Sequence, residues 1–132
     1  MFSLGVDVLA AKLDPPPEHS APGAPGPMAF ADGDRLHGLL GDSGWGGVEI
    51  APCDFCCDFG FDGSDGVEAR LSVLLGTFIG QRANRELRPV IGERRWEGLL
   101  DDVRAELRRH LSGGTLSFPG AAWLVTAENP AS

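Results

Sequence analysis

Three cysteines, Cys53, Cys56 and Cys57, lie close together and are the first residues that suggest chemistry. Cys53 and Cys56 have the spacing of half a zinc site, but a structural zinc usually takes a second ligand pair at short spacing. A redox pair would share this spacing, although Asp54 and Asp58 oppose formation of a thiolate. We therefore interpret the thiols as reduced, small, partly buried residues of a strand. A metal or redox function is the weaker alternative.

An arginine-rich stretch between residues 94 and 109 is a second candidate, as an anion-binding patch. Acidic residues alternate with these arginines, which is more typical of the solvated face of an amphipathic helix. The spacings Asp101/Arg104 and Glu106/Arg109 allow weak ion pairs along that face. The arginines concerned are Arg94, Arg95, Arg104, Arg108 and Arg109.

The composition limits the classes of function. The chain has 132 residues, enough for one domain, while 19 Gly and 10 Pro thin the apolar surface available for a core. The formal net charge of -8 repels phosphate backbones and anionic lipids, so we expect no nucleic-acid partner. No apolar run approaches the roughly 20 residues that span a bilayer, and residues 1–13 lack the pattern of a secretory signal. We expect a cytoplasmic protein with no membrane partner.

The elements that must position these residues begin with a short helix within residues 1–13, where Leu4 to Leu13 carries apolar residues at helical spacing. Residues 14–27 are proline-rich and predict an extended, semi-rigid connector. This segment also has the composition of a ligand for a proline-recognising domain, which we consider the weaker interpretation.

Residues 28–59 predict a helix followed by a strand. Asp32 is a suitable N-cap, an apolar face follows it, and Gly44 ends the helix. Residues 45–51 then alternate between apolar and polar, as a half-buried strand does. Pro52 lacks an N–H and is best tolerated at the edge of a sheet, so we expect an edge strand.

Residues 60–112 predict two helices, one from Val67 to about Gly80 and one from about Glu93 to Leu111. Residues 113–128 then predict the final strand. Pro119-Gly120 should break or bulge its ladder, and Ala121 to Ala127 is apolar on both alternating faces, as in a strand inside a sheet. Only one partner strand is evident, so an open hydrophobic edge would favour association between chains.

Two segments of the chain resemble late parts of the class I S-adenosylmethionine-dependent methyltransferases. Residues 26–55, GPMAFADGDRLHGLLGDSGWGGVEIAPCDF, resemble the family's Gly-Pro-Phe-x-x-x-Asp lead-in, helix and Ala-Gly-Phe-x-x-Val strand. Residues 114–130, GTLSFPGAAWLVTAENP, resemble its antiparallel last strand. The resemblance covers essentially the whole chain and implies a Rossmann-like sheet whose seventh strand lies between the fifth and the sixth. We therefore expect a partial α/β fold, with three or four helices and an antiparallel strand pair.

The resemblance also implies a cofactor, S-adenosylmethionine, for the complete domain. The family holds it with a glycine-rich loop after the first strand and an acidic residue at the end of the second, as in other nucleotide-binding crevices. This chain carries neither motif. Its segment Gly41–Gly47 is glycine-rich, but it follows a helix and precedes a strand, which is the reverse of the order required. We expect no cofactor binding by this chain alone.

Two functional hypotheses follow from the resemblance. The first is the C-terminal, substrate-side portion of a methyltransferase that acts on a small molecule and is not active alone. Its candidate substrate-binding residues are Met28 and Phe30, before the second helix, and Phe78 and Arg82, near the end of the third. Met28 stands where the family often has an aromatic residue. The alternative for Met28, Phe30 and Phe78 is core packing, and for Arg82 a solvated charge. No catalytic residue is assigned.

The second hypothesis is a non-catalytic binding or assembly module. It would pair through the open edge of the final strand, with a second copy of the chain as a homo-oligomer or with a separate cofactor-binding chain.

Overall fold

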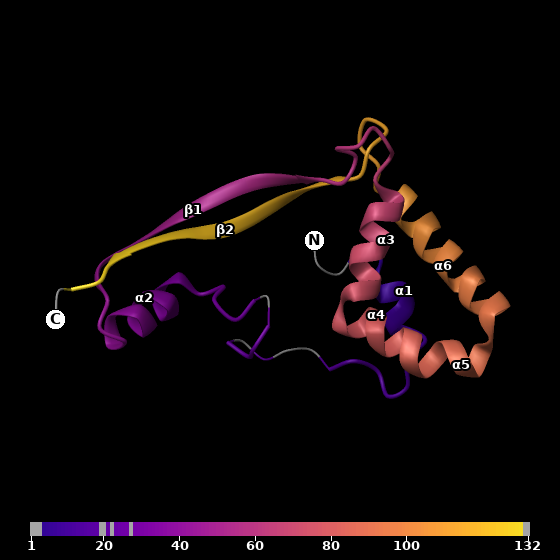
Figure 1. The fold of residues 1–132 in the computed structure, drawn as a ribbon, viewed down its shortest axis with the longest axis horizontal. Helices are drawn as coiled ribbons and strands as arrows, with labels where there is room; N and C mark the ends of the chain where they lie inside the picture. The colour runs from indigo at the N-terminus through magenta and orange to yellow at the C-terminus, as the bar shows by residue number, and fades with distance from the viewer. Residues whose placement is uncertain (1–3, 19–20, 22, 27, 131–132) are drawn as a thin grey trace. The chain divides into compact units, whose positions relative to one another are not determined.

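The computed structural model describes residues 4–18, 21, 23–26 and 28–130. Contacts divide the chain into two compact units, unit 1 with Met1–Glu18 and Cys56–Pro119, and unit 2 with His19–Phe55 and Gly120–Ser132. Within the described residues the elements are α1 (Val6–Ala10), α2 (Gly33–Asp42), β1 (Gly46–Asp58), α3 (Val67–Gly76), α4 (Phe78–Arg82), the π-helix η1 (Ala83–Leu87), α5 (Arg88–Ile91), α6 (Glu93–Arg108) and β2 (Ser117–Glu128) (Figure 1). Helices combined with a two-stranded antiparallel sheet agree with the expected partial α/β class, although the helices outnumber the three or four expected.

The core of unit 1 is built by α1, α3 and α6. Leu9 of α1, Leu74 of α3 and Leu107 of α6 are each 0% exposed and belong to one cluster. α3 and α6 lie side by side in Figure 1 and contact each other. The buried residues of α6 repeat at steps of three and four, as predicted, and are Trp96, Leu99, Leu100, Val103 and Leu107.

The helix predicted from Val67 to about Gly80 is broken at Thr77, so its predicted end is wrong. α3 ends at Gly76, and Thr77 has an extended ψ of 164°. The Thr77 hydroxyl then accepts a hydrogen bond from the Gly80 N–H at 3.2 Å, which caps α4. A side chain on Gly80 would overlap the backbone of Leu74. Gly80 therefore allows a close approach of two helices rather than ending one. η1 and α5 follow and were not predicted.

The N-terminal helix is shorter than the predicted Leu4 to Leu13. It covers Val6–Ala10 only, and Leu13 is buried in the turn that follows. Between α1 and α2 the described residues form neither helix nor strand, as expected for the connector at residues 14–27.

The helix of unit 2 forms as predicted but buries nothing. α2 follows the cap Asp32 and ends shortly before Gly44. None of its residues is buried, and Leu39 on its apolar face is 40% exposed. The apolar face of α2 therefore lacks most of the cover that its pattern calls for, within the part of the chain that the structure describes.

The two strands are longer than predicted, and they pair antiparallel in one constant register (Figure 1). Three pairs of positions define the register, namely Gly47 with Glu128, Phe55 with Gly120, and Phe59 with Leu116. From one pair to the next, the residue number in β1 rises by as much as the residue number in β2 falls, so no extra residue is inserted in either strand. The ladder therefore runs past Pro119-Gly120 without the predicted break or bulge.

The register explains how the strands accept their prolines. The Phe59 N–H donates to the Leu116 carbonyl oxygen at 3.0 Å, and cross-strand bonding recurs at every second residue. The nitrogens of Pro52 in β1 and Pro119 in β2 therefore face the open edges, where a strand needs no donor. For β1 this agrees with the predicted edge position.

The expectation that residues 121–127 are buried on both faces is wrong for this chain. Trp123 is 40% exposed and Leu124 is 60% exposed. The physical reason is that β2 has β1 as its one neighbour in the described sheet, so one edge and much of its apolar surface stay uncovered. No described helix combines the length and the apolar character that a membrane crossing requires.

Candidate functional site

The segment at residues 28–31 is fastened to unit 2 at two carbonyl groups. Arg35 of α2 donates from Nη1 to the carbonyl oxygen of Ala29 at 2.6 Å. Trp123 of β2 donates from its indole Nε1 to the carbonyl oxygen of Ala31 at 3.2 Å. The Trp123 ring also lies where a side chain on Gly33 would be in van der Waals contact with it. The chain just before α2 is therefore held between the helix and the strand.

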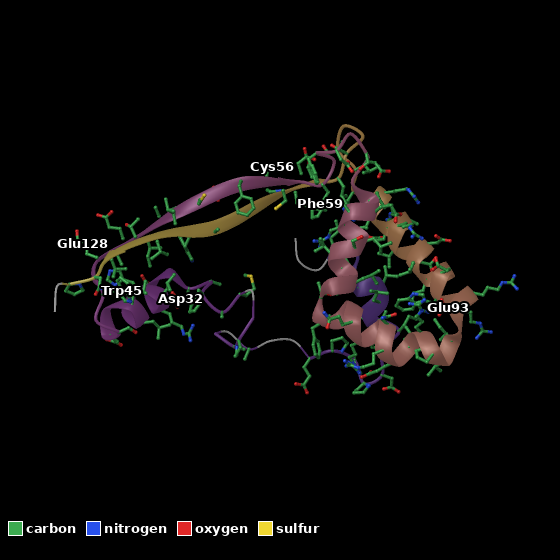
Figure 2. The ribbon with its side chains drawn as sticks, in the orientation of Figure 1. Asp32, Trp45, Cys56, Phe59, Glu93 and Glu128 are labelled. Atoms are coloured by element: carbon green, nitrogen blue, oxygen red, sulfur yellow. The ribbon has the colours of Figure 1, made fainter. Side chains whose placement is uncertain are left out.

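Asp32 ends this segment and begins α2. Its carboxylate Oδ1 accepts the N–H groups of Asp34 at 3.0 Å and of Arg35 at 3.3 Å. These bonds satisfy two of the backbone donors that a helix start leaves unpaired, so the predicted cap is confirmed. Figure 2 labels Asp32, which directly precedes α2, and Trp45, which follows it.

A hollow of about 390 Å³ lies beside this segment, within the size range of small-ligand pockets. Met28 lines it together with Asp32 and Arg35, and the remaining described lining comes from Ala29, Ala31 and small residues of the connector. Phe30 is outside the lining. Met28 is 60% and Phe30 is 55% exposed, so neither residue is packed in the core.

The other two predicted residues, Phe78 and Arg82, belong to α4 in unit 1. Phe78 is 75% exposed, which excludes the core-packing alternative for it. The Arg82 side chain is only 12% exposed. Its Nε donates to Glu86 at 2.9 Å, and its Nη2 donates to the carbonyl oxygen of Pro15 at 2.8 Å. Arg82 is thus a link between α4 and the start of the connector rather than a solvated charge.

The four predicted residues fall in different units, two in each. Met28 and Phe30 are neighbours in unit 2, and Phe78 and Arg82 lie one helical turn apart in unit 1. Sequence reasoning missed Arg35 and Trp123, which hold the Met28 segment. Arg35 lies three residues after the predicted cap, and this spacing was the signal that places it next to the start of the helix. For Trp123 there was no signal in the sequence beyond its position in a predicted strand.

A buried arginine joins strand ends to helices in unit 1. Arg70 of α3 is 5% exposed, and its guanidinium carbon lies 5.6 Å from the ring centre of Phe59 and 5.7 Å from that of Phe118. The two rings meet edge to face, and Nη2 of Arg70 donates to the carbonyl oxygen of Leu4 at 3.3 Å. Burial lowers the pKa of Arg70, against which Cys57 acts as a smaller opposing influence. The arrangement is a cation–π anchor for the end of the two-stranded ribbon that β1 and β2 form.

The cysteines lie on β1, as predicted, where Figure 2 labels Cys56. Cys53 and Cys56 are exposed and Cys57 is half-buried, so the predicted partial burial is wrong for the first two. Side chains alternate along a strand, which directs Cys53 and Cys56 to opposite faces and separates them by about 10 Å. That geometry is too wide for a disulfide or for two ligands of one zinc ion. No cluster of three or more metal-ligating side chains occurs among the described residues.

The predicted ion pairs of the arginine-rich helix form. Arg104 contacts Asp101 at 2.7 Å and also reaches Glu68 of α3 at 2.6 Å, and Arg109 contacts Glu106 at 3.1 Å. The hydrogen bonds that Arg104 donates to Glu68 and Asp101 raise the pKa of Arg104. These pairs match the amphipathic interpretation of α6.

Comparison of the chain with protein-family models, with curated proteins and with solved structures gave no match in any of the three.

Proposed function

We propose that this chain is the C-terminal, substrate-side portion of an S-adenosylmethionine-dependent methyltransferase that acts on a small molecule in the cytoplasm. In this proposal the cofactor is held by a separate N-terminal half, and the chain alone is inactive. β1 is the edge strand and β2 the inner strand of a larger sheet.

The observation that carries the proposal is the open edge of β2. β2 is an apolar strand with one described neighbour, and Leu124 on it is 60% exposed. Strands with apolar residues on both faces normally lie inside sheets that are covered on both sides. A missing adjacent strand and a covering layer would bury this surface, as would be expected for the seventh strand of the family's sheet.

The helix α2 supports the same proposal. It has an apolar face at helical spacing, yet none of its residues is buried. Amphipathic helices gain most of their stability by packing that face against other elements. A larger sheet would supply the missing surface.

The hollow beside Met28 supports a small acceptor. Its volume of about 390 Å³ and its largely apolar lining are typical of pockets for small molecules. Methyl transfer from a sulfonium requires an in-line approach of the acceptor and exclusion of water, so positioning supplies much of the rate. Met28 and Arg35 would then contact the acceptor, with Phe30 beside them.

Calorimetry with S-adenosylmethionine tests this proposal. We expect no heat of binding with the 132-residue chain, and micromolar binding once the polypeptide encoded directly upstream is joined to it. Micromolar binding by the chain alone would overturn the proposal that a separate N-terminal half holds the cofactor. An upstream sequence without a glycine-rich strand-loop-helix would contradict the proposed family.

A second function, assembly through the edge of β2, is favoured by the difference between the two open edges of the ribbon. In the register described, the outward backbone groups of β2 run uninterrupted from Ala121 to Ala127. The outward edge of β1 is interrupted by Pro52 and carries Asp54, and prolines and charges are the devices that protect edges from pairing. The edge of β2 is therefore the one suited to an added strand, here that of a second copy.

Proline substitutions on the two edges test assembly. Ala121→Pro and Ala127→Pro each remove an outward N–H of β2 while leaving the bonds to β1 in place. If copies pair through β2, light scattering should show dimers for the unmodified chain and monomers for both variants. Asp54→Pro, on the outward edge of β1, is the matched control and should remain dimeric. A monomeric unmodified chain at high concentration would rule this function out.

A further inference from the structure

A groove within unit 1 has the features of a ligand site. Its volume is about 520 Å³, and its floor is formed by Leu87 of η1, Ile91 of α5 and Leu99 of α6. Leu99 is a core residue at 6% exposure, and Leu87 and Ile91 pack against the same core. The groove therefore presents an apolar surface on a rigid base. A π-helix ends at Leu87, and such turns occur often at functional sites.

Gly98 keeps the middle of the groove free of side chains. It lies inside α6 and lines the groove. Apart from its chain neighbours and the backbone of its own helix, a Cβ on Gly98 would meet no described atom within 4 Å, so packing does not require glycine there. Glycine inside a helix is less favourable than alanine. Gly98 thus leaves the groove open, although it makes α6 less stable than alanine would.

The rim of the groove is charged. Lys12, which follows α1, and Arg95 and Asp102 of α6 complete its described lining. Arg95 and Asp102 are seven residues apart on one helix, or about 10 Å along its axis, with Gly98 between them. None of these three side chains makes an ion pair or hydrogen bond with another described residue, whereas the Arg88 side chain of α5 pairs with Glu93 at 2.6 Å. Two cations thus stand beside an apolar floor with their hydrogen-bonding groups open to a ligand.

We propose that this groove binds a small amphiphilic carboxylate, with its apolar body on Leu87, Ile91 and Leu99 and its carboxylate at Lys12 and Arg95. A guanidinium presents paired donors that match a carboxylate. Asp102 lies on the other side of Gly98 from Arg95. Because its carboxylate repels a second carboxylate, the ligand should lie with its own carboxylate at the Arg95 end of the groove. This site does not depend on the proposed methyltransferase function, so it can be tested on the 132-residue chain.

Octanoate is the probe, and binding is followed by the backbone amide signals of the chain in solution. We expect saturable shifts confined to the residues of the groove. Octanamide, which is neutral, and octylamine, which is cationic, should bind several-fold more weakly. Equal binding of octanamide would overturn the assignment of a carboxylate, and octanoate shifts centred elsewhere in the chain would overturn the site.

Two neighbouring arginines provide a matched pair of variants. Arg95→Gln should weaken octanoate binding by about three- to tenfold. This range is expected when a charged contact that is exposed or only partly desolvated is lost. Arg94→Gln removes the same charge from a position outside the groove and should leave binding unchanged. Asp102→Asn should tighten binding, since it removes a like charge. Equal effects of the two arginine variants would contradict the proposal.

Filling the groove gives an independent measurement. Gly98→Leu should abolish the octanoate shifts, while Ala105→Leu, on an exposed position of the same helix, should preserve them. Thermal unfolding of both variants shows whether α6 remains folded. Octanoate binding that survives in a folded Gly98→Leu variant would overturn the proposed location.

Discussion

The Phe55 ring lies over Gly120, and this contact is the closest side-chain constraint in the ribbon. Any Cβ at Gly120 would overlap ring carbons of Phe55. The glycine is therefore required by its cross-strand neighbour, not by its own backbone conformation. A sequence pattern does not show this, because it depends on which residues of the two strands face each other.

Gly120→Ala is expected to destabilise the chain by about 1–3 kcal/mol, because the added methyl group must displace the ring or the strand. Urea unfolding followed by circular dichroism measures the loss. Adding Phe55→Ala to the same chain should recover most of it, since the overlap then disappears. Purely additive effects of the two substitutions would contradict the contact.

Asp32→Ala is expected to weaken the start of α2 by about 0.5–2 kcal/mol through loss of its cap. Hydrogen exchange at the amides of Asp34 and Arg35 should become faster. Asp34→Ala changes the charge equally without removing the cap, so it should leave exchange at the Arg35 amide unchanged. A similar acceleration in both variants would indicate a charge effect instead.

The Arg88–Glu93 pair predicts a dependence on pH at the junction of α5 and α6. The hydrogen bond from Arg88 lowers the pKa of Glu93 below its ordinary value of 4.5. A lowered pKa in the folded chain means that the pair stabilises the junction above the unfolded pKa and that this support is lost as the pH falls through the folded pKa. Carbon-detected titration of Glu93 should show the low pKa. Arg88→Gln should return it toward 4.5, and Arg94→Gln should not.

At the scale of elements, local patterns predicted most of the helices and strands. α6 and α2 appear because apolar spacing and an Asp cap are properties of short segments. The break at Thr77 was missed because apolar residues continue at helical spacing across it, from Leu74 and Leu75 to Phe78 and Ile79. The helix α5 was missed because four residues are too few for a period to be visible. The burial predicted for β2 failed because burial depends on neighbours, and the described sheet has only two strands.

The candidate site was predictable only in part, for a related reason. The position of Met28 next to a helix cap is local, and the structure places it at a hollow. The link from Arg82 to Pro15 joins residues that are 67 positions apart, and the bond from Trp123 to Ala31 joins residues 92 apart. Contacts over such separations follow from the fold and leave no periodic signal in the sequence.

At the scale of the whole molecule, the division into two units separates the candidate residues into two pairs that can be tested independently. In a completed enzyme, Met28→Ala should raise KM for the acceptor by about tenfold, the effect of lost apolar contact in a pocket, with a smaller change in kcat. Steady-state kinetics checks this.

Phe61→Ala is the control for loss of an exposed apolar side chain, since Phe61 is 82% exposed and lies outside the hollow. Its kinetics should match those of the unmodified enzyme. If Met28→Ala and Phe61→Ala have the same KM, the hollow beside Met28 is not the acceptor site.

The hydrogen bond between Phe59 and Leu116 shows that the chain leaves the ribbon and returns to it at the same place. All the helices from α3 to α6 are enclosed between these two residues. Their shared exit point allows the enclosed block to be exchanged as a cassette, provided that a new block ends with the same close spacing and covers Leu9 of α1, which α3 and α6 now bury. Replacement of this cassette would change unit 1 while the paired strand segments of unit 2 keep their register.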